Sequence, residues 1–239
     1  MNLAVDFGNT NVKCALFSNN EIVFHKIITE NIEQELNDWS SKHSISQTIL
    51  SSVVNTPSFM EEFLSKNNGF ELTHHTKLPI VNKYTTPETL GKDRLANAVA
   101  LAALYPNKNA LSVDIGTCLK FDFITLNREY LGGSIAPGFE MRLNAMHHFT
   151  DKLPLPEVVV PSNFIGDSTN DALLSGAYYG MLAEIMQVIN FYKVRYTDVV
   201  VVATGGDVHY FEKELKNAIF ANSFLTLVGL NEILKYNVH

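Results

Sequence analysis

Two aspartates each end an apolar run and are followed by glycine two positions later: Asp6 in ‘LAVDFGNTNVK’ and Asp114 in ‘LSVDIGTCLK’. Glycine permits close backbone approach, so successive N–H groups can surround a phosphate oxygen together with the hydroxyls of Thr10 and Thr117. A carboxylate supplies a hard oxygen for a cation or for its water. Two such turns predict polyphosphate binding by both halves of the chain.

The repeat extends beyond these two turns. In both copies an alternating apolar run follows the aspartate, and an asparagine, Asn19 or Asn127, lies thirteen residues after it. This pattern predicts that each half begins with antiparallel strands whose first turn carries Asp-x-Gly. Helical and strand-like segments then alternate, which is typical of a mixed sheet flanked by helices. Pro106 ends an Ala-rich helix, so we expect two domains, residues 1–108 and 109–239.

A third strand end carries two adjacent glycines. Gly205 and Gly206 follow the apolar run ‘VVVVAT’, and we expect them to contact a ribose, an adenine or a phosphate. The chain contains no G-x-x-x-x-G-K-[ST] motif and no G-x-G-x-x-G after a strand, which excludes a Walker-type or Rossmann site as the main interpretation.

Composition limits the partners and the compartment. A net charge of -7 argues against a nucleic-acid or anionic-membrane surface, since either needs clustered Lys and Arg. Cys14 and Cys118 have no metal-ligand spacing, and we expect both to be small buried hydrophobes. The sequence opens directly on a strand-like run, and no window approaches about 18 uninterrupted apolar residues. We therefore expect a cytoplasmic protein without a membrane partner.

A duplicated α/β chain with three strand ends that suit a phosphate resembles the proteins of the actin, Hsp70 and sugar-kinase superfamily. In that superfamily, two ribonuclease-H-like domains hold ATP in a cleft. Within that superfamily the chain resembles type III pantothenate kinase. The blocks that carry the resemblance are ‘DFGNTNVK’, ‘YTTPETLGKDRLANAVA’, ‘DIGTCLKFD’, ‘YLGGSIAPG’ and ‘GDSTNDALLSGAYYG’. The resemblance implies ATP-dependent phosphorylation of pantothenate to 4'-phosphopantothenate, the first step of coenzyme A synthesis. It also implies a divalent ion such as Mg²⁺, a monovalent cation (K⁺ or NH₄⁺) and a homodimer.

The resemblance assigns the acceptor side of the site to ‘GKDR’. Asp93 matches the proposed base for the substrate hydroxyl, although an aspartate at a helix start can equally be a capping carboxylate. Arg94 is unfavourable in a first helical turn, which favours a guanidinium that holds the pantothenate carboxylate or a phosphate over a plain surface arginine. The other pantothenate-contacting positions are Tyr84, Gly91, Lys92 and Thr169. Without the resemblance, Tyr84 can equally be a half-buried interface aromatic.

The nucleotide side is assigned in the same way. Asp6 is expected to face the phosphates through the divalent ion, and Lys13 is either a phosphate contact or a solvated strand residue. Thr117 matches an ATP contact, and Asp114 matches the ligand of the monovalent cation. The remaining expected ATP contacts are Gly8, Asn9, Thr10, Gly205 and Gly206.

One position departs from the family pattern. Where the family commonly reads Asp-x-Gly-Thr-Ala-x-Thr-x-Asp, this chain carries Cys118 and Lys120. The ammonium of Lys120 can neutralise phosphate charge or compete with the monovalent cation, and we expect added potassium to raise activity.

Other features leave alternatives open. The apolar region Ala172–Tyr196 is either central to the core or part of a subunit interface. Adjacent histidines such as His74 and His75 are expected to point to different faces, which disfavours a shared metal. The rival functions are a non-catalytic nucleotide-binding regulator of the accessory transcription factor type, another small-molecule kinase, or a polyphosphate phosphatase on the same scaffold. Asp6, Asp93, Arg94 and Asp114 argue against the regulator.

Overall fold

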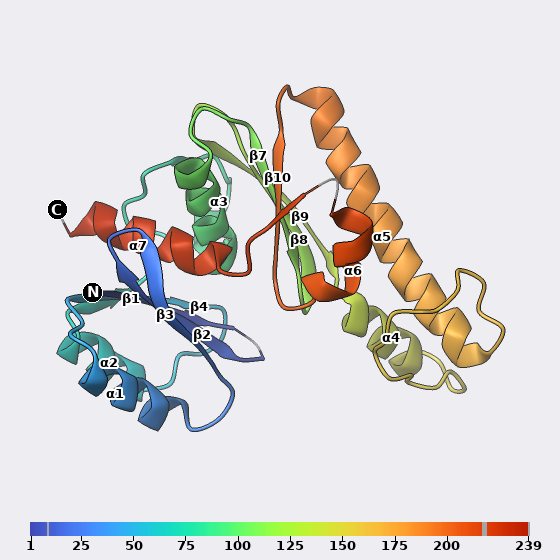
Figure 1. Ribbon diagram of the computed structural model, residues 1–239, viewed down its shortest axis with the longest axis horizontal. Helices are drawn as coiled ribbons and strands as arrows, with labels where there is room; N and C mark the ends of the chain where they lie inside the picture. Colours follow the sequence, from blue (N-terminus) through green and yellow to red (C-terminus); the bar gives the residue numbers. More distant parts are fainter. Residues whose placement is uncertain (9, 217–218, 239) are drawn as a thin grey trace. The chain divides into compact units, whose positions relative to one another are not determined.

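The computed structural model describes residues 1–8, 10–216 and 219–238 of this chain. The chain divides into two compact units (Figure 1). Unit 1 contains Met1–Asn107, Leu126–Leu131 and the C-terminal segment from Phe224, and unit 2 contains Lys108–Thr125 and Gly132–Ser223. The first junction therefore lies one residue before the expected boundary, whereas the C-terminal segment, expected in the second domain, belongs to unit 1.

The sheet of unit 1 has the strand order β3-β2-β1-β4-β5. β1 pairs antiparallel with β2, and β2 pairs antiparallel with β3, while β4 and β5 run parallel to β1. The strands are β1 (Asn2–Phe7), β2 (Val12–Ser18), β3 (Glu21–Ile28), β4 (Gln47–Ser52) and β5 (Gly69–Glu71).

Helices cover both faces of this sheet, with α1 and α2 on one side and α3 and α7 on the other (Figure 1). Odd-numbered residues of β1, Leu3, Val5 and Phe7, belong to one hydrophobic cluster with Leu36 of α1 and Phe63 of α2. Since successive side chains of a strand alternate between faces, the even-numbered residues point toward α3 and α7. The helices are α1 (Ile32–Lys42), α2 (Phe59–Lys66), α3 (Lys92–Leu104) and α7 (Leu225–Asn237).

The C-terminal helix joins unit 1 through close packing on α3. A β-carbon added at Gly229 of α7 would lie 1.8 Å from the carbonyl oxygen of Ala96 in α3, so only glycine permits this approach. Asn231 of α7 also accepts a hydrogen bond from Asn2 of β1 over 3.1 Å. These contacts explain why a segment at the end of the chain packs with its beginning.

The sheet of unit 2 repeats the order of the first: β11-β10-β7-β8-β9 corresponds, strand by strand in chain order, to β5-β4-β1-β2-β3. β7 and β8 are antiparallel, while β10 and β11 run parallel to β7. The duplication predicted from the two Asp-x-Gly turns is therefore confirmed. The strands are β7 (Ala110–Ile115), β8 (Cys118–Ile124), β9 (Glu129–Pro137), β10 (Val200–Thr204) and β11 (Phe220–Ala221). The first residues of β9, Glu129 and Tyr130, belong to unit 1 and pair there with the short strand β6 (Val81–Asn82).

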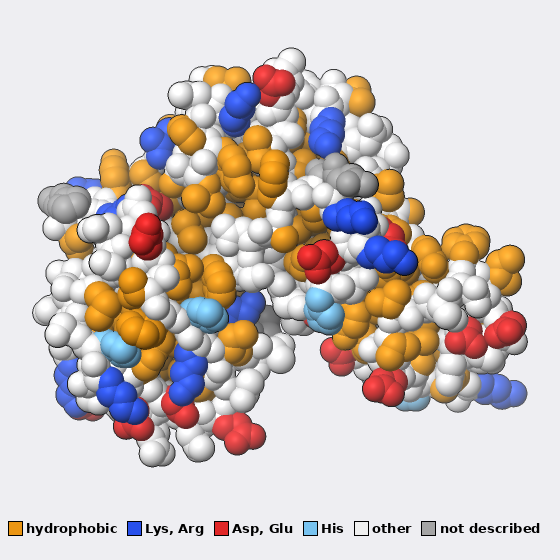
Figure 2. All heavy atoms as spheres, viewed as in Figure 1, with side chains coloured by type: hydrophobic (Ala, Val, Ile, Leu, Met, Phe, Trp, Pro, Cys, Tyr) orange, Lys and Arg blue, Asp and Glu red, His pale blue; other side chains and the backbone are white. Residues whose placement is uncertain are grey.

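Helix α5 (Thr169–Arg195) buries one side in the core of unit 2, from Leu173 to Ile189, and exposes apolar residues on the other side. Met186, Phe191 and Val194 are 55%, 62% and 80% exposed. Phe149, Phe164 and Ile165, in the loops that precede α5, are also exposed, and hydrophobic side chains show on this part of the surface at the right of Figure 2. By length and composition α5 meets the criterion for a membrane span among the described residues, and half of its most apolar segment is buried inside the molecule.

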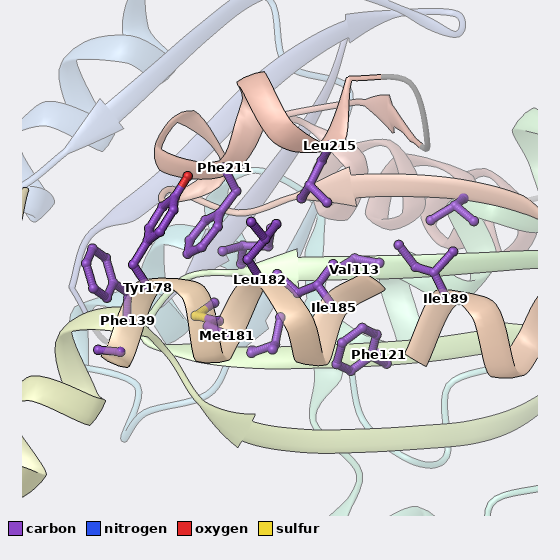
Figure 3. Close-up of a cluster of buried hydrophobic side chains, with 14 of the residues drawn as sticks. Val113, Phe121, Phe139, Tyr178, Met181, Leu182, Ile185, Ile189, Phe211 and Leu215 are labelled. Atoms are coloured by element: carbon purple, nitrogen blue, oxygen red, sulfur yellow. The ribbon is translucent and has the colours of Figure 1, made fainter. Parts of the chain in front are cut away.

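The buried side of α5 packs on the sheet of unit 2 together with α4 (Phe139–His148) and α6 (Val208–Leu215). The ring of Tyr178 stacks on Phe211 with 4.8 Å between centroids, and its hydroxyl donates to Glu214 over 3.0 Å. Burial, followed by that hydrogen bond, raises the pKa of the Tyr178 phenol. Figure 3 shows the residues of α5 that face the strands, Met181, Leu182, Ile185 and Ile189.

The adjacent histidines differ from expectation. His74 and His75 lie in a turn, and their ring centroids are 3.9 Å apart. The expectation that neighbouring histidines point to different faces is wrong for this pair, because it assumed a helix or a strand. Within the described part of the chain, no group of three or more His, Cys, Asp or Glu side chains is placed to hold a metal ion.

Candidate active site

In unit 1, Asp6 lies between a lysine and a serine on the neighbouring strands. Its register partners are Lys13 on β2 and Ser51 on β4. Side chains in register on adjacent strands point to the same face, and this is the face covered by α3 and α7. Strand pairing therefore brings a carboxylate, an ammonium and a hydroxyl together at the end of β1.

The turn after Asp6 is closed by the Gly8 N–H, which donates to the carbonyl of Asn11 over 3.1 Å. Thr10 is exposed in this turn, as a residue that contacts a ligand must be. Asn9, which the sequence analysis also assigned to the nucleotide, lies outside the described residues.

Unit 2 repeats this arrangement with different geometry. Asp114, which is 8% exposed, has Lys120 of β8 and Thr204 of β10 as its register partners. Lys120 Nζ lies 2.8 Å from Asp114 Oδ2, and the two side chains are 19% and 12% exposed. The lysine at the position that departs from the family pattern thus forms an ion pair with the aspartate expected to bind a monovalent cation.

The glycines after β10 lie beside the turn after β7. Gly205 has a φ of 105°, and a β-carbon there would lie 2.1 Å from the carbonyl oxygen of Ile115, so the position requires glycine. A β-carbon at Gly206 would meet nothing within 4 Å. The Asp207 N–H donates to Ile115 over 2.9 Å, which joins the two segments. Gly206 is therefore the glycine whose backbone a ligand can approach.

Gly138 is a site residue that sequence reasoning did not single out. Its N–H donates to the carbonyl of Thr117 over 3.1 Å, and a β-carbon there would lie 2.0 Å from the carbonyl oxygen of Gly116. The glycine at the end of the block ‘YLGGSIAPG’ was the available signal. Gly138 supports the turn that presents Thr117, whose side chain is exposed.

The acceptor-side residues gather at the start of α3 in unit 1. Gly91 is the N-cap, Asp93 lies in the first turn, and Lys92 Nζ donates to the carbonyl of Leu90 over 3.4 Å. Because the N-cap has no side chain, the cap itself is not Asp93. A carboxylate in the first turn of a helix interacts favourably with the partial positive charge of the helix N-terminus.

Arg94 is buried, with 3% of its surface exposed, so the alternative of a plain surface arginine is wrong. Its guanidinium carbon lies 5.6 Å from the ring centroid of Tyr84, within cation–π distance. Tyr84 in turn stacks on Tyr130, with 6.2 Å between centroids and an angle of 18° between planes. Sequence reasoning missed Tyr130, because its contact arises only when β6 pairs with β9.

Thr169, the remaining pantothenate position, is the first residue of α5 in unit 2 and is exposed. The helix start is well defined there, since the Ser168 hydroxyl accepts a hydrogen bond from the Asp171 N–H over 3.2 Å. Its contact with a substrate stays a prediction.

The residues fit the two expected cations unequally. Mg²⁺ is usually held by one or two carboxylates together with substrate phosphates, and Asp6 at its turn fits that need. The surroundings of Asp114 do not fit a free monovalent cation, because the ammonium of Lys120 lies 2.8 Å from Asp114 Oδ2.

Two sheets of the same strand order, each with a carboxylate at the end of its first strand and a glycine turn after it, define an α/β protein of the actin-like fold class. The family model described as type III pantothenate kinase matches residues 2–190. A type III pantothenate kinase of Christiangramia forsetii is 40% identical and one of Flavobacterium johnsoniae is 37% identical, each over at least 99% of both chains. This chain belongs to the type III pantothenate kinase family.

Solved structures show the same fold at lower sequence identity. A Campylobacter jejuni protein described as a Baf family transcriptional activator superposes with a TM-score of 0.61 at 22% identity, over 98% of both chains. An inorganic polyphosphate/ATP-glucomannokinase from Arthrobacter superposes with a TM-score of 0.51 at 11% identity, also over 98% of both chains. At these identities the likeness concerns the fold alone.

Proposed function

We propose that this chain transfers the γ-phosphoryl group of ATP to the primary hydroxyl of pantothenate, giving 4'-phosphopantothenate, the first intermediate of coenzyme A synthesis. The observation that carries the proposal is the start of α3, where Asp93 and a buried Arg94 follow Gly91, in a chain of the type III pantothenate kinase family. Phosphoryl transfer needs mainly positioning and charge stabilisation, and both depend on fixed side chains such as these.

Asp93 is the proposed base that accepts the proton of the pantothenate hydroxyl. It lies in the first turn of α3, two residues after the N-cap Gly91, and a general base must lie within hydrogen-bond reach of the proton that it accepts. Arg94 is the proposed partner of the pantothenate carboxylate. A planar guanidinium can hold a carboxylate through two parallel hydrogen bonds, and its packing against Tyr84 limits its rotation.

Asp6 is the proposed carboxylate for the divalent ion. The proposed phosphate contacts of unit 1 are Gly8, Asn9, Thr10 and Lys13. When bound, the divalent ion neutralises charge that develops on the phosphate oxygens. In unit 2, Thr117, Gly205 and Gly206 are the proposed contacts for ATP, and Thr169 is a proposed contact for pantothenate. Gly91 and Lys92 are proposed to line the pantothenate site with Tyr84.

The proposal is tested by a coupled assay for ADP release with ATP, magnesium and pantothenate, on the wild type and on Asp93→Asn. Removing a general base is expected to lower kcat by about 10²-fold to 10⁴-fold. Asp38→Asn, at an exposed position of α1, is the matched control and is expected to keep the wild-type rate. ADP release that does not depend on pantothenate, or an undiminished rate for Asp93→Asn, would contradict the assignment.

A non-catalytic regulator makes a different prediction, since it would bind ATP without pantothenate-dependent turnover. The same assay therefore separates the two functions. The net charge of -7 supports a small-molecule substrate rather than nucleic acid or an anionic membrane, and the proposed location is the cytoplasm.

We also propose a homodimer formed through the exposed apolar side of α5. Phe191 and Val194 are 62% and 80% exposed on a helix whose other side is buried. Packing against a second copy of the chain would remove this apolar face from water. Sedimentation is expected to show a dimer for the wild type and a monomer for Phe191→Glu. Leu126→Glu, at an exposed loop position of unit 1, is the control that should stay dimeric. A wild-type monomer would overturn this part of the proposal.

A further inference from the structure

The ion pair between Lys120 and Asp114 is set by strand pairing. The two residues are register partners on β8 and β7, so their side chains must leave the same face of the sheet beside each other. Nζ and Oδ2 are 2.8 Å apart, a normal distance for a charge-assisted hydrogen bond.

The surroundings make this pair unlike one on the surface. Its side chains are only 19% and 12% exposed, so water screens the two charges little. The other carboxylate oxygen of Asp114 is close to Gly205, where a β-carbon would lie 2.7 Å from Oδ1. The carboxylate is therefore enclosed on one side by backbone and on the other by the ammonium.

We propose that Lys120 is a tethered cation that takes the place of a free monovalent ion at Asp114, so that this kinase works without potassium or ammonium. The alkylammonium head of lysine is a compact point charge, and it is chemically a substituted ammonium ion. Because the chain carries it, it is present at every Asp114 whatever the salt, whereas a free ion must bind from solution. The inference rests on the proposed function, and it replaces the expectation that added potassium raises activity.

The test compares the wild type, Lys120→Thr and Lys120→Ala in chloride salts of potassium, sodium, ammonium and N-methylglucamine at equal ionic strength. Melting temperatures are measured without substrates, so this readout does not need activity. The wild type is expected to melt at the same temperature in all four salts. Both variants are expected to melt higher in potassium or ammonium than in N-methylglucamine, because a free ion can then neutralise Asp114. Lys152→Thr, an exposed position of unit 2, is the matched control and should behave as the wild type.

The kinase assay in the same salts supplies the second readout. The wild-type rate is expected to be the same in sodium and in potassium, and the two Lys120 variants are expected to gain severalfold from potassium or from ammonium. A wild-type rate or melting temperature that rises in potassium would overturn the inference, and so would variants that do not respond to any of the ions. If the wild type makes no ADP in any salt, the proposed function fails, and the melting temperatures still decide the role of Lys120.

Discussion

Oδ1 of Asp93 lies so close to Gly91 that a β-carbon added to the glycine would be 2.7 Å from this oxygen. The carboxylate is the mobile end of a side chain, so Gly91→Ala is expected to displace it rather than the backbone. A proposed base moved by a fraction of an ångström to one ångström loses alignment with its substrate, and kcat is expected to fall by about 10-fold to 100-fold. The melting temperature should change little, since exchanging glycine for alanine at an N-cap costs at most about 1 kcal/mol.

Gly176→Ala is the control for this prediction. A β-carbon at Gly176, in α5, meets nothing within 4 Å, so the substitution is expected to keep kcat and to leave the fold intact. An unchanged kcat for Gly91→Ala would argue that the observed position of the Asp93 carboxylate is not the one used in catalysis.

Arg94→Lys tests whether the buried guanidinium recognises the carboxylate of pantothenate. Lysine keeps the positive charge but loses the planar pair of donors and the contact 5.6 Å above the Tyr84 ring. We expect the KM for pantothenate to rise by about 10-fold or more, from the loss of one charge-assisted hydrogen bond, with a smaller effect on the KM for ATP. Steady-state kinetics with each substrate varied in turn measures both. Arg128→Lys, at an exposed position of unit 1, should change neither, and equal effects on both KM values in Arg94→Lys would contradict a pantothenate contact.

Gly205→Ala and Gly206→Ala are expected to differ although the residues are adjacent. Alanine at position 205 combines a φ of 105° with a β-carbon 2.1 Å from a backbone oxygen, so the free energy of unfolding should fall by more than about 2 kcal/mol. The β-carbon at position 206 has open space, so the melting temperature should be unchanged while the KM for ATP rises if nucleotide approaches that backbone. Thermal unfolding and ATP kinetics of the pair separate the glycine that the backbone conformation requires from the glycine that has open space at its β-carbon position. Equal loss of stability in both variants would refute the distinction.

The two cysteines are expected to react differently with iodoacetamide. Cys14 is 0% exposed, and burial raises the pKa of its thiol to about 12, so the reactive thiolate is scarce at pH 8. Cys118 is partly exposed, which makes it a less buried residue than the sequence led us to expect. Mass spectrometry of the native protein at pH 8 should find one labelled thiol, and the Cys118→Ser variant should show none. Labelling of Cys14 at the rate of Cys118 would show that the first strands of unit 1 open readily.

Much of the local structure follows from the sequence. The alternation of helical and strand-like segments is one example: helix α1 (Ile32–Lys42) has an amphipathic pattern, which is a local signal. The duplication can also be predicted from the sequence, since apolar and polar residues alternate after each Asp-x-Gly turn and indicate the same antiparallel hairpin twice. Family blocks in the right order then indicate which chemistry these elements carry.

Other features depend on contacts between residues far apart in the chain. Burial of Arg94 and its position over Tyr84 could not be read from ‘GKDR’, because they arise when the loop before α3 packs in unit 1. The C-terminal segment shows by its apolar residues that it forms a buried helix, but not which unit it joins. The close approach of Gly229 to Ala96 decides that.

The sequence by itself determined the two Asp-x-Gly turns, the glycine pair after a strand, and the family to which the chain belongs. Each of these can be recognised from residue types at short spacing along the chain. Only the tertiary structure decided what lies beside each aspartate, because neighbours in a sheet are set by strand register and not by sequence distance. Asp114 and Lys120 stand six residues apart in the chain, and the register of β7 and β8 makes them an ion pair. A lysine that was ambiguous in the sequence is thereby placed on the carboxylate that a potassium ion was expected to occupy.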